Sequence, residues 1–224
     1  MFDRIARRYD LVNSLISLGL HKGWKRLVAE AAQVPSGGLA LDVCAGTGDI
    51  AVSLARNGAR VVALDFSSPM MAIGRRRAAG LPVAHVRGDA LLLPFPDNAF
   101  DAATIGFSLR NLISRTRLFA EMARVVRPGG WLVTLETSQP PNRLIRRLYH
   151  LYLGLAITCA SLIAEGAAYR YLAGTIIGFP PAEAVAKELH EAGLVEVRFR
   201  RLFLGAVAVH YGQVPASATS RSSP

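Results

Sequence analysis

The sequence predicts an α/β fold built on a largely parallel β-sheet. Short apolar runs, typical of buried strands, alternate with segments in which apolar residues recur at helical spacing. Such alternation places the strands side by side in one sheet, with helices packed on its faces. The chain has 224 residues, 51% of them hydrophobic and 19% charged, which is enough for one domain with a substantial core. This composition excludes disorder over the whole length.

Apolar runs that end at turn residues give the strands. We expect parallel strands at 39–43, 60–64, 83–87, 100–105 and 131–135. Two further runs, 195–203 and 206–211, are joined near Gly205 and predict an antiparallel hairpin at the end of the sheet. Together the runs predict a Rossmann-like sheet of seven strands.

In the connections between these strands, apolar residues recur at helical spacing. We expect helices at 50–56, 68–79 and 115–126, the last of them ended by Pro128-Gly129-Gly130. Two segments stand outside the alternation: 2–33 predicts one or two N-terminal helices, and 141–192 predicts a region that is helical throughout. We therefore expect one domain, 1–213, with 1–33 as a lid, 141–192 as a helical cap insertion, and 214–224 as a disordered tail.

The charge and the cysteines narrow the class of protein. Lys and Arg number 26 and Asp and Glu 16, so the net charge of +10 favours an acidic ligand, a nucleic acid or an anionic membrane surface. Cys44 and Cys159 exclude a disulfide scaffold and lie in no C-x-x-C pattern, so we expect no metal site and a reducing cytoplasm. The longest apolar run, 151–164, is shorter than the roughly 20 residues of a spanning helix.

A glycine turn follows the first expected strand. Gly46-Thr47-Gly48-Asp49-Ile50-Ala51 opens a helix and matches the dinucleotide pattern G-x-G-x-x-A. Glycines let the backbone pass close to a ligand, and the N–H groups at a helix start attract negative charge. Taken alone, the pattern also fits a tight βα turn that binds nothing.

Two carboxylates follow the next strands. Asp65 ends the second strand, 17 residues after Gly48, where an acid can accept hydrogen bonds from ribose hydroxyls. Asp89 and Ala90 follow the third strand, where a carboxylate and a backbone N–H can read an adenine edge. Either acid alone could be a turn or surface residue. Because the three features end successive strands, they together predict a nucleoside-containing cofactor.

The same residues belong to longer motifs that resemble class I S-adenosylmethionine methyltransferases. These motifs are Asp42-x-x-Ala45-Gly46-Thr47-Gly48-Asp49, Asp65-Phe66-Ser67-x-x-Met70, Asp89-Ala90, the run 93–101 and Arg127-Pro128-Gly129-Gly130. The chain more specifically resembles the UbiE/MenG-type C-methyltransferases of ubiquinone and menaquinone biosynthesis. That resemblance rests on the opening Met1-Phe2-Asp3 to Trp24, Phe107-Ser108-Leu109-Arg110-Asn111, the run 168–180 and Gly205 to Gly212.

The resemblance implies S-adenosylmethionine as the cofactor and a polyprenylated quinol, most directly demethylmenaquinol, as the acceptor. It implies cofactor contacts at Asp42, Gly46, Thr47, Gly48, Asp65, Met70, Asp89, Ala90 and Gly106. The last of these is commonly serine in the family. It also implies catalytic roles for Arg110, Asn111 and Tyr9.

The chemistry of methylating a ring carbon suggests roles for Arg110, Asn111 and Tyr9. A ring carbon is nucleophilic only if a neighbouring phenol, of reference pKa about 10, is deprotonated or strongly hydrogen-bonded. We expect Arg110 to stabilise the phenolate and hold a water, and Asn111 to orient the ring oxygen. Tyr9 lies on a helix that could close over the cofactor. Without the resemblance, Arg110 would be read as a surface arginine and the first helix as ordinarily amphipathic.

Departures from the family pattern fall where the acceptor is expected. Glu136-Thr137-Ser138-Gln139-Pro140 replaces the usual Glu-Phe-Ser-Lys-Pro, and Gly174-Thr175-Ile176 replaces Glu-Ser-Ile. Residues 156–166 lack the expected Pro-x-x-Gly pattern. These departures leave the shape of the acceptor pocket undetermined. None of them falls in the motifs expected to bind the methyl donor.

The region after the sheet also suggests a membrane partner. Arg143, Arg146, Arg147 and His150 precede the apolar run, and a basic-then-apolar helix can lie in a membrane interface. The same helix could instead pack on the protein's own core. We expect a cytoplasmic protein, peripheral on the inner face of the cell membrane, and leave a homodimer open.

Other functions remain as alternatives. The acceptor could be another small apolar phenol or a lipid. A nicotinamide-dependent oxidoreductase is disfavoured by Ala51, where a third glycine is commonest, and by the terminal hairpin. The intact Gly46, Gly48, Asp65 and Asp89 argue against a binding protein without activity. No stripe of aromatic and basic residues supports a nucleic-acid partner.

Overall fold

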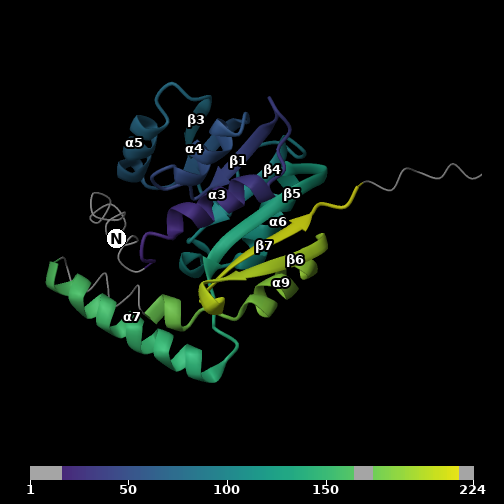
Figure 1. Cartoon of the computed structure of the whole chain (residues 1–224). Helices are drawn as coiled ribbons and strands as arrows, with labels where there is room; N and C mark the ends of the chain where they lie inside the picture. The colour runs from purple at the N-terminus through teal and green to yellow at the C-terminus, as the bar shows by residue number, and fades with distance from the viewer. Residues whose placement is uncertain (1–16, 164–173, 217–224) are drawn as a thin grey trace, which may run out of the picture.

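A computed structural model describes residues 17–163 and 174–216 and shows a seven-stranded sheet between helical layers (Figure 1). Its strands are β1 (Leu39–Val43), β2 (Arg60–Asp65), β3 (Val83–Arg87), β4 (Phe100–Gly106), β5 (Val126–Thr137), β6 (Val195–Leu202) and β7 (Val207–Gln213). They lie in the order β3-β2-β1-β4-β5-β7-β6. The first five pair in parallel, and β7 pairs antiparallel with both β5 and β6. The α/β class, the seven strands and the terminal hairpin are thus confirmed.

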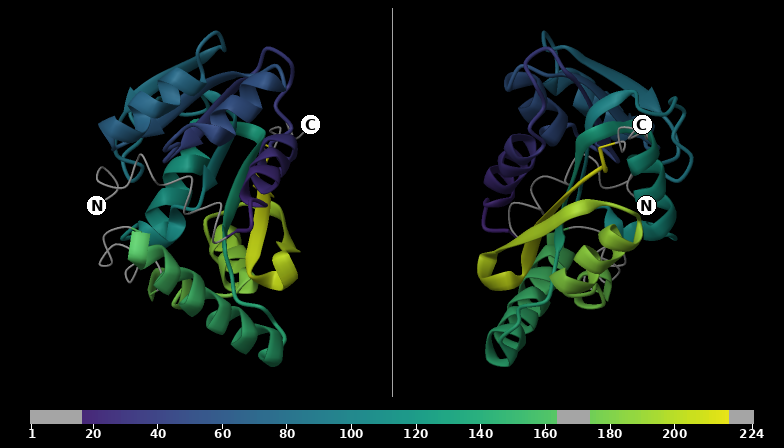
Figure 2. Two further views of the ribbon diagram at one scale, coloured as in Figure 1. Left: turned by 60° about the vertical axis from the view of Figure 1, so that its left-hand side comes forward. Right: turned by 90° about the vertical axis from the view of Figure 1, so that its right-hand side faces the viewer.

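Helices cover both faces of this sheet. Their bounds are α3 (His21–Ala31), α4 (Asp49–Arg56), α5 (Ser68–Arg77), α6 (Arg115–Val125), α7 (Arg143–Ile163) and α9 (Ala182–Glu191). Apolar residues of α3 and α4 pack on one face, and those of α6 and α9 pack on the other. Figure 2 shows purple α3 and teal α6 on opposite sides of the sheet, and α7 as a long helix beyond it.

One predicted turn is a strand. We expected Pro128-Gly129-Gly130 to separate a helix from the next strand, but α6 passes directly into β5 at Val126. The pairing with β4 shifts register there, because Phe100 faces Val126 whereas Ala102 faces Trp131. Backbone hydrogen bonds between Val214 and the two glycines hold this bulge, so the contacts of the sheet extend to Val214.

The region 141–192 is not helical throughout. The helical residues 174–177 end at Gly178, and α9 begins only after Pro180-Pro181, with Pro181 at its N-cap. Proline in that position disfavours a continuous helix because it lacks an N–H and restricts the residue before it. Val185 and Leu189 of α9 are fully buried in the core beside α6. This last part of the region therefore forms a core layer of the fold.

The described residues contain only part of the predicted N-terminal lid, and Tyr9 lies outside them. Within it, a turn at 17–20 leads into α3, whose Trp24 and Val28 pack against the sheet. Among the described helices, none is both long and apolar enough to cross a membrane.

Candidate active site

In the glycine turn after β1, the backbone adopts conformations that favour glycine. Gly46 and Gly48 have φ values of 56° and 83°, a region that L side chains rarely adopt. Gly48 precedes the first residue of α4. Gly74 of α5 packs closely there, since a Cβ added to Gly48 would lie 3.3 Å from the Gly74 Cα. The turn is therefore shaped by close backbone packing as well as by its own glycines.

Asp65, at the end of β2, holds this turn in place. One carboxylate oxygen accepts the Gly46 N–H at 2.7 Å, and the other accepts the Ser67 N–H at 2.7 Å. A carboxylate has about four lone-pair sites, so these bonds leave it able to accept ribose hydroxyls as well. The residue expected to contact ribose thus also fixes the glycine turn.

Asp42 is a buried carboxyl that ties three elements together. Its Oδ1 accepts the Thr104 hydroxyl from β4 at 2.9 Å, and its Oδ2 accepts the Ala51 N–H from α4 at 3.0 Å. Burial raises the pKa of Asp42 from 3.8 to about 7, although both hydrogen bonds act to lower it.

A small cavity opens over the glycine turn, which we call the donor cavity. Its lining is Lys25, Asp42, Cys44, Ala45, Gly46, Thr47, Asp49, Ile50 and Gly106. Four residues expected at the cofactor site, Asp42, Gly46, Thr47 and Gly106, therefore meet here. A Cβ at Gly106 would lie 2.6 Å from Ile50 Cδ1, so Ile50 fills space that the commoner serine would need.

Lys25 is a cavity residue that sequence patterns did not reveal. It projects from α3, is largely buried, and donates to Asp49 Oδ2 at 2.7 Å. Arg77 donates to the other oxygen of Asp49 at 2.8 Å and to the Thr47 hydroxyl at 3.0 Å. Burial opposes ionisation of Asp49, but the two cations outweigh it and lower its pKa. Only its spacing of one helical turn from His21 could have suggested Lys25.

The other expected cofactor residues lie outside the donor cavity. Asp89, exposed beyond β3, accepts the Leu91 N–H at 2.8 Å, and the neighbouring Ala90 is buried. Met70 is buried in α5, where the Ser67 hydroxyl accepts its backbone N–H at 3.4 Å. The structure therefore places these three residues toward the β3 edge of the sheet.

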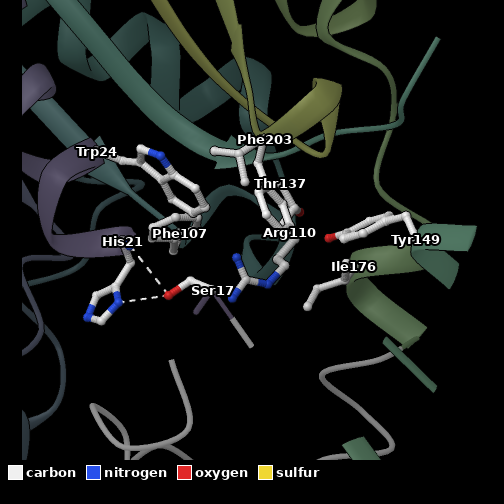
Figure 3. A pocket seen from close by; sticks show the side chains of 10 residues that line it. Ser17, His21, Trp24, Phe107, Arg110, Thr137, Tyr149, Ile176 and Phe203 are labelled. Carbon is white, nitrogen blue, oxygen red and sulfur yellow. Dashed lines mark hydrogen bonds between the residues drawn. The ribbon is translucent and has the colours of Figure 1, made fainter. Parts of the chain in front are cut away.

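A second pocket lies beyond the ends of β4 and β5, and we call it the acceptor pocket. It is lined by Ser17, His21, Trp24, Phe107, Arg110, Thr137, Tyr149, Ile176, Phe203 and Val207 (Figure 3). The ring centroid of Trp24 lies 6.5 Å from that of Phe107 and 5.9 Å from that of Phe203. Aromatic and aliphatic side chains thus make most of its wall.

Arg110 is the charged group of this pocket. It follows β4 in a short turn, and its side chain, only 5% exposed, forms an ion pair with the fully buried Glu136 of β5. Its Nε is buried and has no acceptor among the described residues. The alternative of a surface arginine is therefore wrong. Asn111 shares the turn, but it is not among the residues that line the pocket.

Tyr149 completes the polar part of the wall. It comes from α7, and its hydroxyl points toward Arg110 in Figure 3. Burial raises the pKa of Tyr149, although the Arg110 charge acts to lower it, so the phenol stays protonated. On the opposite side, the Ser17 hydroxyl lies 2.8 Å from His21 Nδ1. Ser17 belongs to the opening motif of the family resemblance but was given no role there, and Tyr149 comes from a segment without a motif of its own.

The fold and these adjoining pockets are those of a class I S-adenosylmethionine-dependent methyltransferase. An S-adenosylmethionine-dependent methyltransferase of Thermotoga maritima shares the fold, with a TM-score of 0.69 over 95% of this chain and 97% of that one, at 18% identity. The methyl donor is S-adenosylmethionine, and the chain is an enzyme.

More specifically, the chain belongs to the ubiE/COQ5 methyltransferase family, whose model matches residues 1–214. A demethylmenaquinone methyltransferase of Mycobacterium marinum is 43% identical over 217 residues, which are 96% of this chain and 92% of that protein. The protein of that name from Mycolicibacterium gilvum is 44% identical over 217 residues, 96% and 93% of the two chains.

Proposed function

We propose that the enzyme methylates a ring carbon of a prenylated quinol, and that demethylmenaquinol, converted to menaquinol, is its acceptor. The observation that carries this proposal is the buried Nε of Arg110, which has no acceptor in the described part of the chain and lies in a pocket walled by aromatic rings. A flat apolar ring that bears a hydroxyl would fill such a pocket and accept that N–H. The mycobacterial relatives named for this reaction support the naphthoquinol over its benzoquinol counterpart in ubiquinone synthesis.

The order of the strands supports one direction for the donor. Neighbouring strands β3, β2, β1 and β4 lead to Asp89, Asp65, the glycine turn and Gly106, in that order across the sheet. We assign adenine to Asp89 and Ala90, ribose to Asp65, and the methionine part to the donor cavity. Met70 borders the adenosine end from α5. The methyl group then faces β4 and the acceptor pocket.

Lys25 is well placed to hold the methionine carboxylate. Of the described residues, it is the one cation that lines the donor cavity, and the acids beside it suit the donor's ammonium group. An ammonium has three N–H donors, and Asp49 is the acceptor that the structure gives for one of them. The remaining donors can therefore bind a carboxylate without breaking the ion pair.

The chain's own groups would favour attack by carbon. S-adenosylmethionine supplies an electrophilic methyl group, which the acceptor takes by in-line displacement as the carbon–sulfur bond breaks. Because Glu136 balances its charge, Arg110 acts chiefly as a fixed N–H donor to the acceptor oxygen in a buried setting. Tyr149 is a neutral second donor. Water held by Arg110 takes the ring proton, and the expected roles of Asn111 and Tyr9 stay predictions.

The two faces of α7 suggest how a lipid-linked acceptor reaches the pocket. Tyr149, Leu153 and Ile157 lie on the inner face, and the latter two are buried. On the opposite face Leu144, Leu148, Leu151 and Leu155 are 57–65% exposed. The arginines Arg143 and Arg147 flank this leucine face. We propose that the leucine face lies on an anionic membrane surface, so that the protein is peripheral there. A homodimer through the same face is the competing arrangement.

The single domain, 1–213, is part of this proposal. Within the described residues, Ser17, His21 and Trp24 of the predicted lid and Tyr149 of the predicted cap line the acceptor pocket. A second candidate, methylation of another apolar phenol, is favoured by Thr137, because a hydroxyl-bearing side chain lines the pocket where the family usually has phenylalanine.

The quinones of a strain that lacks this gene test the proposal. We expect a desmethyl menaquinone to accumulate and the methylated form to return when the gene is restored. Restoring the gene with Arg110→Gln should leave the desmethyl form in place. An unchanged quinone profile would direct the search to another phenol.

A further inference from the structure

Gln139, two residues beyond β5, joins three segments around the acceptor pocket. Its side-chain Nε2 lies 3.2 Å from the carbonyl oxygen of Ile176, 3.0 Å from that of Ile177 and 3.1 Å from that of Phe179. Its Oε1 lies 3.1 Å from His150 Nε2 on α7. One side chain thus connects the end of the sheet, the cap helix and the segment 176–179.

The contacts show which end of the Gln139 side chain is the NH₂ group and which is the oxygen. Three carbonyl oxygens surround one end of the amide, so that end must be the NH₂ group. The other end is the amide oxygen, and His150 must donate to it from Nε2.

The three carbonyls lie where a helix ends, and that of Ile176 also accepts the Phe179 N–H at 3.3 Å. The helical residues 174–177 stop at Gly178, and the last carbonyls of any helix lack partners within it. The chain then continues through Phe179 into Pro180, which has no N–H to offer. Gln139 thus caps the end of this helix from a distant part of the sequence.

Both anchored segments supply walls of the acceptor pocket. Ile176 lines it directly, and His150 follows Tyr149, which also lines it. Figure 3 shows Tyr149 and Ile176 on the same side of Arg110. We propose that Gln139 is a positioning residue that holds these two walls at the distance the acceptor ring requires, and so determines acceptor affinity. This inference rests on the proposed role of the pocket.

The residue type makes the inference specific to this chain, since the family usually has lysine here. A lysine ammonium would donate to the same carbonyls and suit the helix end, but it could not accept from His150. A glutamate would accept from His150 and repel the carbonyls. The two halves of the amide can therefore be tested separately.

Steady-state kinetics, donor binding and hydrogen exchange together test this role. Gln139→Ala should raise the KM for demethylmenaquinol about tenfold, the loss expected for a few hydrogen bonds. Its kcat and its affinity for S-adenosylmethionine should stay within about twofold of wild type, because the donor cavity is not touched. Exchange of the amides of residues 176–179 should become faster. Gln139→Lys should restore much of this protection, and Gln139→Glu should be the weakest variant.

Gln213→Ala is the matched control. Gln213 also donates to a backbone carbonyl, that of Gly129 at 2.8 Å, but at the far end of β5. It should leave the KM for the quinol unchanged. A Gln139→Ala enzyme with wild-type KM and wild-type exchange would overturn the proposal, as would a lost donor affinity with unchanged KM. Should the wild-type enzyme not act on the quinol, the proposed function fails, and the exchange comparison alone decides whether Gln139 holds the two walls.

Discussion

The guanidinium of Arg110, which lines the acceptor pocket, is held by the carboxylate of Glu136, and both side chains are buried. The pair joins the end of β4 to the end of β5. Breaking a buried pair by removing one partner costs roughly 3–5 kcal/mol, because the other charge is left uncompensated. Substitutions of Arg110 that keep a donor toward Glu136 are therefore the informative ones.

Arg110→Lys and Arg110→Gln should lower kcat about 10²-fold and leave S-adenosylmethionine binding nearly intact. Each retains an N–H for Glu136, but neither reproduces the planar group that also presents Nε to the acceptor. The loss should shrink at high pH, where more acceptor is already phenolate. Turnover and calorimetric donor binding measure the two effects, and collapse of donor affinity with full kcat would make Arg110 a cofactor residue instead.

Asp65→Ala should weaken S-adenosylmethionine binding by about one to two powers of ten. The change removes an ionised acceptor for the ribose and also releases the N–H groups of Gly46 and Ser67. Calorimetry measures the affinity directly. Tight binding of NADH without any binding of S-adenosylmethionine by the wild-type enzyme would refute the cofactor assignment.

Lys25→Met should weaken binding of S-adenosylhomocysteine by at least about tenfold, because the carboxylate of this ligand loses a charged hydrogen-bond donor. Binding of 5′-methylthioadenosine, which has no carboxylate, should change little. Comparing both ligands on both enzymes isolates this one interaction. An equal loss for the two ligands would mean that Lys25 acts only by holding Asp49.

Asp42→Asn should make the slope of stability against pH more positive between about pH 4 and 7. The folded-state pKa of Asp42 is raised to about 7, so the folded protein binds this proton where the unfolded chain has released it. Asp42 therefore makes stability fall as the pH rises from about 4 to about 7, by up to ~1.4 kcal/mol per pH unit. Asparagine can still accept from Ala51 and donate to Thr104. Urea unfolding of both proteins across this range checks it, and an identical slope would contradict the raised pKa.

Leu148→Ser with Leu151→Ser should reduce binding to anionic vesicles, and added salt should release the wild-type protein. Leu92→Ser is the control, because Leu92 is 66% exposed on a loop after β3, away from α7. Vesicle flotation measures the effect. Equal recovery of wild type and the double variant would exclude the leucine face, and a change in sedimentation instead would indicate the homodimer.

Local patterns were sufficient for the strands, the hairpin and the glycine turn, because these depend on neighbours in sequence. They could not show that Arg110 is buried against Glu136, since the two residues meet only when β4 and β5 pair. Lys25 reaches the donor cavity for a similar reason, through the packing of α3 on α4.

The two wrong predictions have different causes. Gly130 sits in a bulge where a Cβ would lie 2.5 Å from the Asp101 carbonyl oxygen, and the bulge is held by Val214 from the other end of the chain. No local pattern reveals that contact. The break before α9, in contrast, was visible in Pro180-Pro181, and apolar spacing was given too much weight there.

The most direct test of the central claim is the product formed by the purified enzyme from demethylmenaquinol and S-adenosylmethionine with a trideuterated methyl group. The account predicts menaquinol that carries the intact trideuteromethyl group on a ring carbon, as mass spectrometry and NMR would show. Arg110→Gln should form it far more slowly. A methyl group on the quinol oxygen, or an unchanged quinol beside a methylated phenol of another kind, would contradict the account.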